Sequence, residues 1–423
     1  MEDLLHYVWR HMLDRSQTMT TTDGRPLRVI DPGLHNTDAG PDFFNAKIEI
    51  DGTMWAGNVE LHQRSSDWYA HGHDRDRAYD SVVLHVCCVA DRAITRHGGG
   101  EMPQLLLQVP DDVRRNYESL QRAAQTPACA AVTAQMPAIV TRSWLASLAV
   151  ERMRDKTGAV NARLARMGGN WEDAFFVALA RSFGFGINGD TFERWATALP
   201  FRAMDKHRDG LHQVESIMFG TSGLLDDGGK DPYETALRDE YAYLRHKFSL
   251  PAAPPLAWQM MRTRPANFPH VRIAQLAHLY HTTPSLFSRM MEADTAGLRH
   301  LLAGGTSDYW HTHYTFSRTS PYTRRTVTAK SAALIAINTI APHLYAYGLY
   351  KGDTALCDKA QELLESLPAE DNHVTRLWRQ AGITPESAAD TQALMQLTRE
   401  YCEKKKCIYC RFGYEYLKCK RIL

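Results

Sequence analysis

One stretch of the sequence decides the fold of the N-terminal part: residues 40 to 62, which read GPDFFNAKIEIDGTMWAGNVELH. The runs Phe43 to Ile50 and Thr53 to His62 are rich in β-branched and aromatic residues, as strands usually are. Asp51-Gly52 between them is a two-residue turn of the kind that adopts positive φ angles. The stretch therefore predicts an antiparallel hairpin.

Further extended runs flank this hairpin. Three of them are bounded by turn-forming residues and are expected to be strands: Leu27 to Asp31, Val82 to Ala90 and Gln104 to Val109. Five apolar residues near the start recur at helical spacing and predict a first helix: Leu4, Leu5, Val8, Trp9 and Met12. Residues 1 to 110 are therefore expected to form an α/β domain around a mixed sheet of about five strands.

The pattern becomes helical after Pro110. Amphipathic stretches are expected near 111–125, 138–166, 171–184, 211–219, 232–247, 271–303, 328–350, 353–367 and 386–403. The clearest linker among them is Pro251 to Pro255. The chain is therefore expected to belong to the α+β class. Its large all-α domain would cover residues 111–398, and a basic, cysteine-rich tail would cover residues 399–423.

Length and composition limit the class of protein. The 423 residues predict two or three domains. Hydrophobic residues make up 44% and charged residues 23%, which is typical of folded proteins and excludes a disordered or fibrous chain. The 49 Lys and Arg residues nearly cancel the 48 Asp and Glu residues, so a nucleic-acid surface would have to be a local patch.

No segment is expected to enter a membrane or to direct secretion. The most apolar stretch, Ala332 to Tyr350, is interrupted by Asn338, Pro342 and His343, whereas a membrane span needs about 20 mostly apolar residues. The first residues, Met1 to Asp3, are acidic, unlike the basic start of a secretory signal. A cytoplasmic location is therefore expected.

Polar residues are concentrated between Gly40 and His85. Because side chains alternate along a strand, Glu60 and His62 should project from the same face, and the hairpin can bring Asp42 towards them. Magnesium prefers oxygen ligands and usually takes one or two carboxylates. Asp42 and Glu60, with the backbone carbonyl of Leu61, are therefore expected to hold Mg²⁺ or Mn²⁺, and His62 would face the attacking water or a phosphate oxygen.

The same segment also fits a transition-metal site. Imidazole and carboxylate groups bind Zn²⁺ or Mn²⁺, and the His-x-His pattern at residues 71 to 73 supplies two imidazoles. The candidate ligands of this alternative are His62, His71, His73 and His85, with Asp67 or Asp74.

Gly-Pro-Asp, a hairpin and then Glu-x-His resemble the PD-(D/E)XK nuclease superfamily, and residues 67 to 73 loosely resemble its very-short-patch-repair branch. The resemblance covers about 60 residues and implies metal-dependent hydrolysis of phosphodiester bonds. The catalytic residues would be Asp42, Glu60 and His62, with Glu2 as an auxiliary acid. Nucleic acid, DNA before RNA, would be the partner. The whole chain also resembles a bacterial family of unknown function, which assigns no residue roles.

One departure from the superfamily pattern supports a second function. His62 stands where most members have Lys. This favours a non-catalytic nucleic-acid-binding or assembly protein that keeps a nuclease-like fold.

The tail contains four closely spaced cysteines. Cys402, Cys407, Cys410 and Cys419 include a short Cys-x2-Cys pair, which is typical of tetrahedral zinc or of an iron–sulfur cluster. The alternative is that they lie on one helix as small buried hydrophobic residues.

The tail is also basic, and aromatic residues are interleaved with its charges. Lys404, Lys405, Lys406 and Arg411 could contact phosphates while the aromatic rings stack on bases. A solvated basic segment whose tyrosines pack inward is the alternative.

Overall fold

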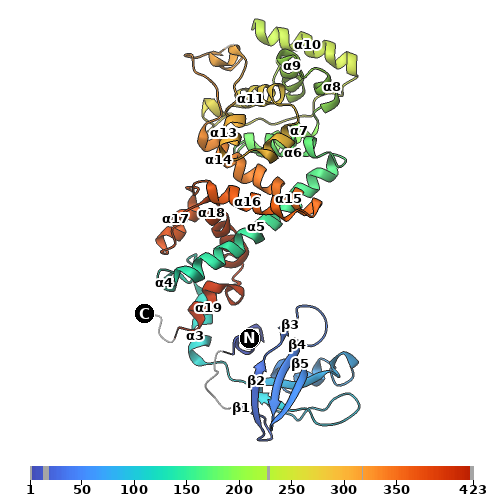
Figure 1. The fold of residues 1–423 in the computed structure, drawn as a ribbon, viewed down its shortest axis with the longest axis vertical. Helices are drawn as coiled ribbons and strands as arrows, with labels where there is room; N and C mark the ends of the chain where they lie inside the picture. Colours follow the sequence, from blue (N-terminus) through green and yellow to red (C-terminus); the bar gives the residue numbers. More distant parts are fainter. Residues whose placement is uncertain (1, 13–18, 226–228, 317, 420–423) are drawn as a thin grey trace. The chain divides into compact units, whose positions relative to one another are not determined.

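The computed structural model describes the chain except residues 1, 13–18, 226–228, 317 and 420–423. The chain divides into two compact units (Figure 1). The first comprises residues 1–141, 380–383 and 397–423, and the second comprises residues 142–379 and 384–396. The predicted α+β class is confirmed, because a mixed sheet precedes a large helical region. The first unit extends beyond residue 110 and includes the tail.

The first unit contains one sheet and several short helices. Its strands are β1 (Met19–Thr20), β2 (Pro26–Asp31), β3 (Leu34–His35), β4 (Phe43–Ile50), β5 (Thr53–Arg64), β6 (Val82–Val89) and β7 (Gln104–Leu106). Its helical elements are α1 (Glu2–His11), α2 (Asp67–Ala70), η1 (Arg77–Tyr79), α3 (Asp111–Arg122), α4 (Ala130–Thr133), the π-helical turn η5 (Leu397–Cys402), η6 (Cys407–Tyr409) and α19 (Arg411–Leu417).

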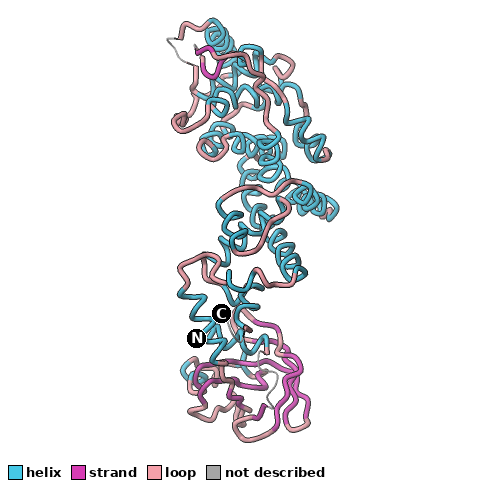
Figure 2. Tube along the Cα trace, turned by 90° about the vertical axis from the view of Figure 1, so that its left-hand side faces the viewer, coloured by secondary structure: helices cyan, strands magenta, loops and turns pink. Residues whose placement is uncertain are grey.

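The sheet has seven strands in the order β1-β2-β4-β5-β6-β7, with β3 also paired to β4. Figure 2 shows its strands gathered together in magenta. The predicted hairpin is confirmed: Ile50 pairs with Thr53, and Asp51 and Gly52 adopt φ angles of 49° and 73°. Strand β6 runs parallel to β5, and β7 runs parallel to β6. The sheet exceeds the expected five strands because β1 and β3 have only two residues each, too few for a periodic pattern.

Helix α1 forms where the apolar spacing predicts it. Leu4, Leu5, Val8 and Trp9 are buried, and the indole nitrogen of Trp9 donates to the carbonyl of Pro32 at 3.1 Å. The helix contacts β5. On β5, two buried apolar residues, Val59 and Leu61, alternate with the polar residues Glu60 and His62. The strand therefore keeps its polar pair on the opposite face from its apolar pair.

The second unit is almost entirely helical. Its helices are α5 (Ala138–Arg166, which starts in the first unit), α6 (Trp171–Phe183), α7 (Gly189–Thr197), α8 (Phe201–Lys206), α9 (Leu211–Ser222), α10 (Pro232–Phe248), η2 (Pro265–Asn267), α11 (Pro269–Thr282), α12 (Leu286–Glu292), α13 (Thr295–Ala303), η3 (Asp308–His311), α14 (Ala329–Ile335), the π-helical turn η4 (Ala336–Ile340), α15 (Ala341–Lys351), α16 (Thr354–Ser366), α17 (His373–Gln380) and α18 (Ala388–Gln396). It also contains a small hairpin of β8 (His313–Thr315) and β9 (Arg318–Thr319).

The predicted helix over 271–303 is wrong as one element, because the structure divides it into α11, α12 and α13. Thr283 precedes Pro284 and has a ψ angle of 84°, outside the helical region. A residue before proline is disfavoured in the α region, which explains the break between α11 and α12.

One helical stretch in the described part of the chain is long and apolar enough to cross a membrane. It spans Ala329–Lys351, and 72% of its most apolar 18-residue segment is buried. Ile335, Ile340 and Leu344 within it belong to the core of the second unit. This burial indicates a core helix of a folded domain, an arrangement found in soluble proteins. The cytoplasmic location stays a prediction.

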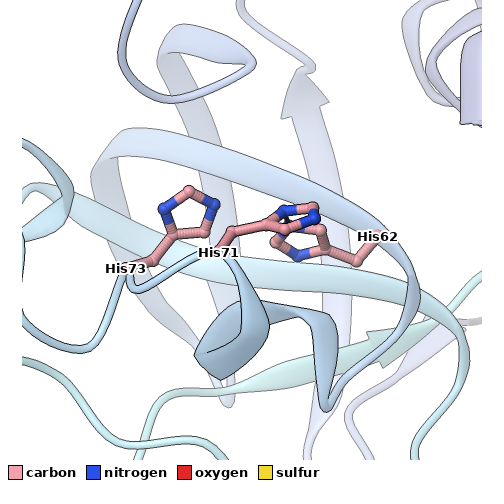
Figure 3. A group of neighbouring side chains, drawn as sticks. All are labelled: His62, His71 and His73. Carbon is pink, nitrogen blue, oxygen red and sulfur yellow. Dashed lines mark hydrogen bonds between the residues drawn. The ribbon is translucent and has the colours of Figure 1, made fainter.

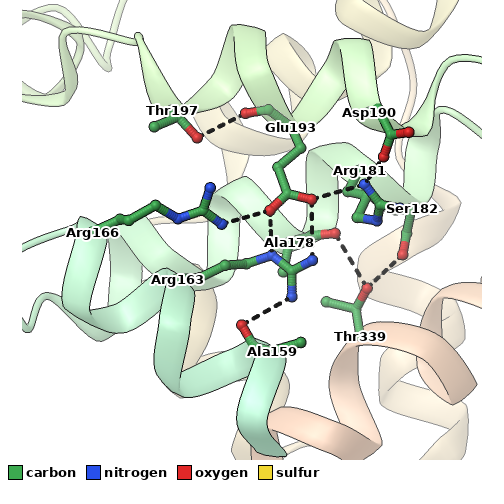
Figure 4. A network of polar contacts seen from close by, with 10 residues as sticks. All are labelled: Ala159, Arg163, Arg166, Ala178, Arg181, Ser182, Asp190, Glu193, Thr197 and Thr339. Atoms are coloured by element: carbon green, nitrogen blue, oxygen red, sulfur yellow. Dashed lines mark hydrogen bonds and ion pairs between the residues drawn. The ribbon is translucent and has the colours of Figure 1, made fainter. Parts of the chain in front are cut away.

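An ion-pair network joins three helices of the second unit (Figure 4). Glu193 on α7 accepts hydrogen bonds from Arg163 and Arg166 on α5, both at 2.8 Å, and from Arg181 on α6 at 2.9 Å. Burial alone would raise the pKa of Glu193, but its hydrogen bonds and charge interactions with the three arginines lower it from 4.5 to about 2. The network therefore stabilises the folded state only while Glu193 is ionised.

We expect acid to weaken this unit through Glu193. A carboxyl group whose pKa is lowered by folding contributes stability above its unfolded pKa, and the contribution disappears as the pH falls from about 4.5 towards 2. The loss should be on the order of 2 to 3 kcal/mol. Thermal unfolding followed at several pH values should show a shallower acid dependence in Glu193→Gln than in the wild type. Equal acid dependence of both proteins would contradict the assignment.

Candidate metal centre

The candidate metal centre lies where the chain crosses from β5 to the parallel strand β6. Glu60 and His62 project from β5, and the crossover segment, residues 65–81, returns two more histidines, His71 and His73, to their side. The strands approach closely at Gly57, where a Cβ atom would lie 2.3 Å from Cγ1 of Val83. A larger residue there would push β6 away from the polar face.

A tight turn directs the two crossover histidines. Helix α2 ends at His71, and the next residue, Gly72, has a φ angle of 77°, which favours glycine. The amide of His73 then donates to the carbonyl of Trp68 at 3.0 Å. This turn explains why two histidines separated by one residue can face the same point.

Three imidazoles meet at this point. The ligand atoms of His62, His71 and His73 all lie within 4.8 Å of one another, and Figure 3 shows their rings side by side. Nε2 of His62 lies 3.1 Å from Nδ1 of His71. His62 is almost fully buried and His71 is exposed, so the group extends from the interior to the surface.

Glu60 places a carboxylate oxygen beside two of these imidazoles. Its Oε1 lies 3.2 Å from Nε2 of His73 and 3.7 Å from Nε2 of His62. Zinc binds such atoms at about 2.0 to 2.2 Å, which in a tetrahedron separates neighbouring ligand atoms by roughly 3.4 Å. The three separations measured around Nε2 of His62 and Oε1 of Glu60 are close to this value. The donor set therefore fits a single divalent transition-metal ion.

Burial keeps the central imidazole neutral. Desolvation, followed by the neighbouring imidazoles of His85, His73 and His71, lowers the pKa of His62 to about 2. Burial also lowers the pKa of His85 to about 4. A neutral imidazole retains the lone pair that a metal needs. Burial raises the pKa of Glu60, and the charge of the nearby Asp42 raises it further. An adjacent cation would favour its ionised form.

His85 orients the central ligand. Its Nε2 lies 2.8 Å from Nδ1 of His62, and the two residues are on neighbouring strands. This contact occupies one ring nitrogen of His62 and leaves Nε2 for the metal, the usual arrangement around metal-binding histidines. The ring of Tyr79 stacks on His73 with centroids 3.8 Å apart. Trp68 packs edge-on against His73 and His85.

Asp42 lies beside the four ligand atoms. Its Oδ2 accepts a hydrogen bond from the amide of Leu61 at 2.9 Å, and its own amide donates to Oε2 of Glu60 at 3.0 Å. Nε2 of His6 on α1 lies 3.3 Å from the same Oδ2. The structure therefore places Asp42 next to Glu60 and adds His6. No local pattern could identify His6, because its spacing on α1 gives no indication of a site.

Other residues named from the sequence lie elsewhere. Glu2 is exposed at the start of α1. Asp67 accepts from the amide of Arg64 at 3.0 Å, and Asp74 pairs with Arg75. These two aspartates thus have local partners within the turn.

The tail residues separate into exposed and packed groups. Lys404, Lys406 and Arg411 are exposed, whereas the ammonium group of Lys405 donates to the carbonyl of Ala123. Phe412 and Tyr416 are buried, and Tyr409 is exposed. Cys402, Cys407 and Cys410 line one small cavity, but the thiol of Cys419 donates to the carbonyl of Glu415 at 3.3 Å.

The chain belongs to a protein family described as "Protein of unknown function (DUF2851)", which matches residues 2–373. The resemblance of the whole chain to a family of unknown function is thereby confirmed. No curated protein and no solved structure matches the chain. The comparisons thus give the nuclease resemblance no support, and the assignment of an activity depends on the geometry of the site.

Proposed function

We propose that the N-terminal domain is a metal-dependent hydrolase that cleaves phosphodiester bonds in nucleic acid. The observation that supports it is the convergence of His62, His71 and His73, whose ligand atoms lie within 4.8 Å of one another, with Glu60 next to two of them and Asp42 beside Glu60. With three imidazoles as ligands, a fourth position can take the Glu60 carboxylate, and such sites can expand to five ligands to admit water or substrate. The exposed His71 marks the side from which a substrate would approach.

The donor set favours the transition-metal alternative from the sequence over Mg²⁺. Magnesium selects oxygen ligands, whereas imidazole suits zinc and iron, and a carboxylate such as that of Glu60 also suits manganese. The three ligand atoms that lie within 4.8 Å of one another are all imidazole nitrogens, and Glu60 adds a carboxylate oxygen beside them. We therefore infer that Zn²⁺ or Mn²⁺, rather than Mg²⁺, is the working ion. The bound ion would polarise the phosphoryl group and lower the pKa of water.

The structure also changes the role that we assign to His62. A histidine with a pKa of about 2 is a poor base at neutral pH, and Nε2 of His62 is one of the converging atoms. We assign His62 as a ligand. Asp42, with a side chain that is 23% exposed, is the carboxylate available to accept a proton from the attacking water.

Nucleic acid as the substrate rests on two observations. Asp42 directly precedes β4, and Glu60 lies beside it on the neighbouring strand β5, as the resemblance to the PD-(D/E)XK superfamily implies. The tail of the same unit exposes Lys404, Lys406 and Arg411.

The test is cleavage by the purified full chain. Protein loaded with Zn²⁺, Mn²⁺ or Mg²⁺ is incubated with labelled single-stranded, duplex and branched DNA and with RNA. We expect cleavage with Zn²⁺ or Mn²⁺ that a chelator stops and that His73→Asn loses. His97→Asn, a change of an exposed histidine in the same unit, is the matched control and should cleave normally. No cleavage of any substrate with any of the ions would refute the proposal.

A non-catalytic nucleic-acid-binding protein is the second candidate. One observation favours it: Asp42 and Glu60 each already accept a hydrogen bond from a backbone amide. Such a protein would bind metal and nucleic acid and would leave the nucleic acid intact.

Both candidates predict that the exposed tail charges contribute to binding. Changing Lys404, Lys406 and Arg411 together to Ala should weaken nucleic-acid binding and make the slope of log affinity against log salt shallower, by about 0.9 for each duplex DNA phosphate that the variant no longer neutralises. Lys405 stays unchanged because it holds the carbonyl of Ala123. Fluorescence anisotropy at several salt concentrations measures the slope.

A matched control for this experiment removes three exposed charges from the second unit: Lys230, Arg299 and Lys330. Their replacement by Ala changes the net charge equally and should leave the slope as in the wild type. If both triple variants bind alike, the tail is not part of the nucleic-acid surface.

A further inference from the structure

Four cysteines distant in sequence surround one cavity in the first unit. Cys129 lies immediately before α4, Cys402 ends η5, Cys407 begins η6 and Cys410 precedes α19. None of the four is in a disulfide, and all four line one cavity of about 20 Å³.

The four thiols are close enough to influence one another. Burial raises the pKa of Cys129, and the nearby Cys410, Cys402 and Cys407 raise it further. Burial likewise raises the pKa of Cys402, with Cys410 and Cys407 adding to the effect. Lys405 is the basic group that opposes the shift of Cys402 and Cys407.

The local backbone is shaped around this cavity. The amide of Cys410 donates to the carbonyl of Cys407 at 3.2 Å, which closes the Cys-x2-Cys segment into a tight turn. Gly413 on α19 packs directly against this turn, because a Cβ atom there would lie 1.9 Å from the carbonyl oxygen of Cys407. Lys405 adopts a φ angle of 53°, which turns the chain between η5 and η6. These features place the three tail thiols around the same space.

We infer that Cys129, Cys402, Cys407 and Cys410 bind one thiophilic metal centre, either a zinc ion or an iron–sulfur cluster. Four thiols with a Cys-x2-Cys turn form the usual closed set for structural zinc and also suit an iron–sulfur cluster. The spacing of cysteines in the tail alone would indicate Cys419 as the fourth ligand. The cavity identifies Cys129 instead. Because Cys129 is 273 residues from Cys402 in the numbering of the chain, only the folded structure identifies it.

The centre would fasten the C-terminal tail to the rest of the first unit. Existing contacts already join these segments: the side-chain amide of Asn116 on α3 donates to the carbonyls of Tyr416, Leu417 and Cys419. A four-thiolate centre would add a second link between the segment around α4 and the segment η5–α19. It does not depend on the histidine centre, because the two sets of ligands share no residue.

The experiment measures metal in the full chain, purified anaerobically without chelators. The double variant His71→Asn/His73→Asn serves as the background protein, and every cysteine variant is made in it. Metal at the histidine centre then does not contribute to the measured content. In this background we expect close to one zinc per chain, or iron and sulfide with visible absorbance. Cys129→Ser and Cys407→Ser should each reduce the content to near zero. The controls Cys419→Ser and Cys357→Ser should keep it.

A measurement on the background protein covers the case in which the cysteine variants fail to fold. X-ray absorption at the edge of the retained metal should show sulfur neighbours at about 2.3 Å. Background protein that retains neither zinc nor iron would overturn the inference. Equal metal content in Cys129→Ser, Cys407→Ser and the controls would overturn it equally.

Discussion

Glu60→Gln is expected to abolish metal-dependent cleavage while leaving the fold intact. The substitution removes, at almost constant shape, the carboxylate charge that lies 3.2 Å from Nε2 of His73 and 3.7 Å from Nε2 of His62. Metal affinity should fall, and the cleavage rate should drop on the order of 10³-fold or more, because stabilisation of the transition state by the ion is lost. Isothermal titration with Zn²⁺ or Mn²⁺ and single-turnover cleavage measure the two effects separately.

The variant Asp42→Asn tests whether Asp42 accepts a proton while Glu60 binds the metal. If Glu60 binds the metal and Asp42 only accepts a proton, Asp42→Asn should keep metal affinity near the wild-type value and slow cleavage by roughly 10² to 10⁴-fold. Glu49→Gln changes a carboxylate on the same hairpin that pairs with Arg28, so it serves as the matched control for both variants. Cleavage that persists in Glu60→Gln and Asp42→Asn would assign the activity to another site.

The hairpin and the polar face of β5 could be predicted because their determinants are local. Asp51 and Gly52 specify the turn, and strict alternation places Glu60 and His62 together. The short strands β1 and β3 could not be predicted, because two residues cannot show a period. Helix α7 begins at a glycine, which weakens its helical signal.

The composition of each site depends on contacts that no local pattern encodes. The His-x-His segment indicates His71 and His73 as ligands, but the left-handed turn at Gly72 and the β5–β6 crossover decide where they point. His6 reaches Asp42 only because α1 packs near the start of β4. Cys129 reaches the tail cysteines in the same way, through tertiary folding.

A small apolar cluster beneath the crossover segment holds the two histidines in place. Trp68 is 1% exposed and packs with Val82, Ile94 and Met102. On its other sides it contacts the rings of Tyr79, His73 and His85. Trp68 therefore links the core of the crossover to one ligand and to the residue that orients another.

Trp68→Ala is accordingly expected to reduce both stability and metal affinity. Removing a buried tryptophan leaves a cavity, which typically costs about 3 to 5 kcal/mol in the free energy of unfolding. The crossover segment would lose its anchor, so His71 and His73 would no longer be held towards β5, and metal affinity should fall by roughly 10 to 100-fold. Denaturant unfolding and metal titration measure the two effects.

Trp55→Ala is the matched control, because Trp55 lies on β5 but is 42% exposed. It should change stability little and leave metal affinity as in the wild type. If Trp68→Ala lowers stability yet binds metal as tightly as Trp55→Ala, the cluster supports the fold without positioning the histidines. If Trp68→Ala loses both stability and metal affinity and Trp68→Phe, which keeps an aromatic ring, retains both, Trp68 is a positioning residue. A ring in this place would then be sufficient to hold the crossover over Glu60 and His62.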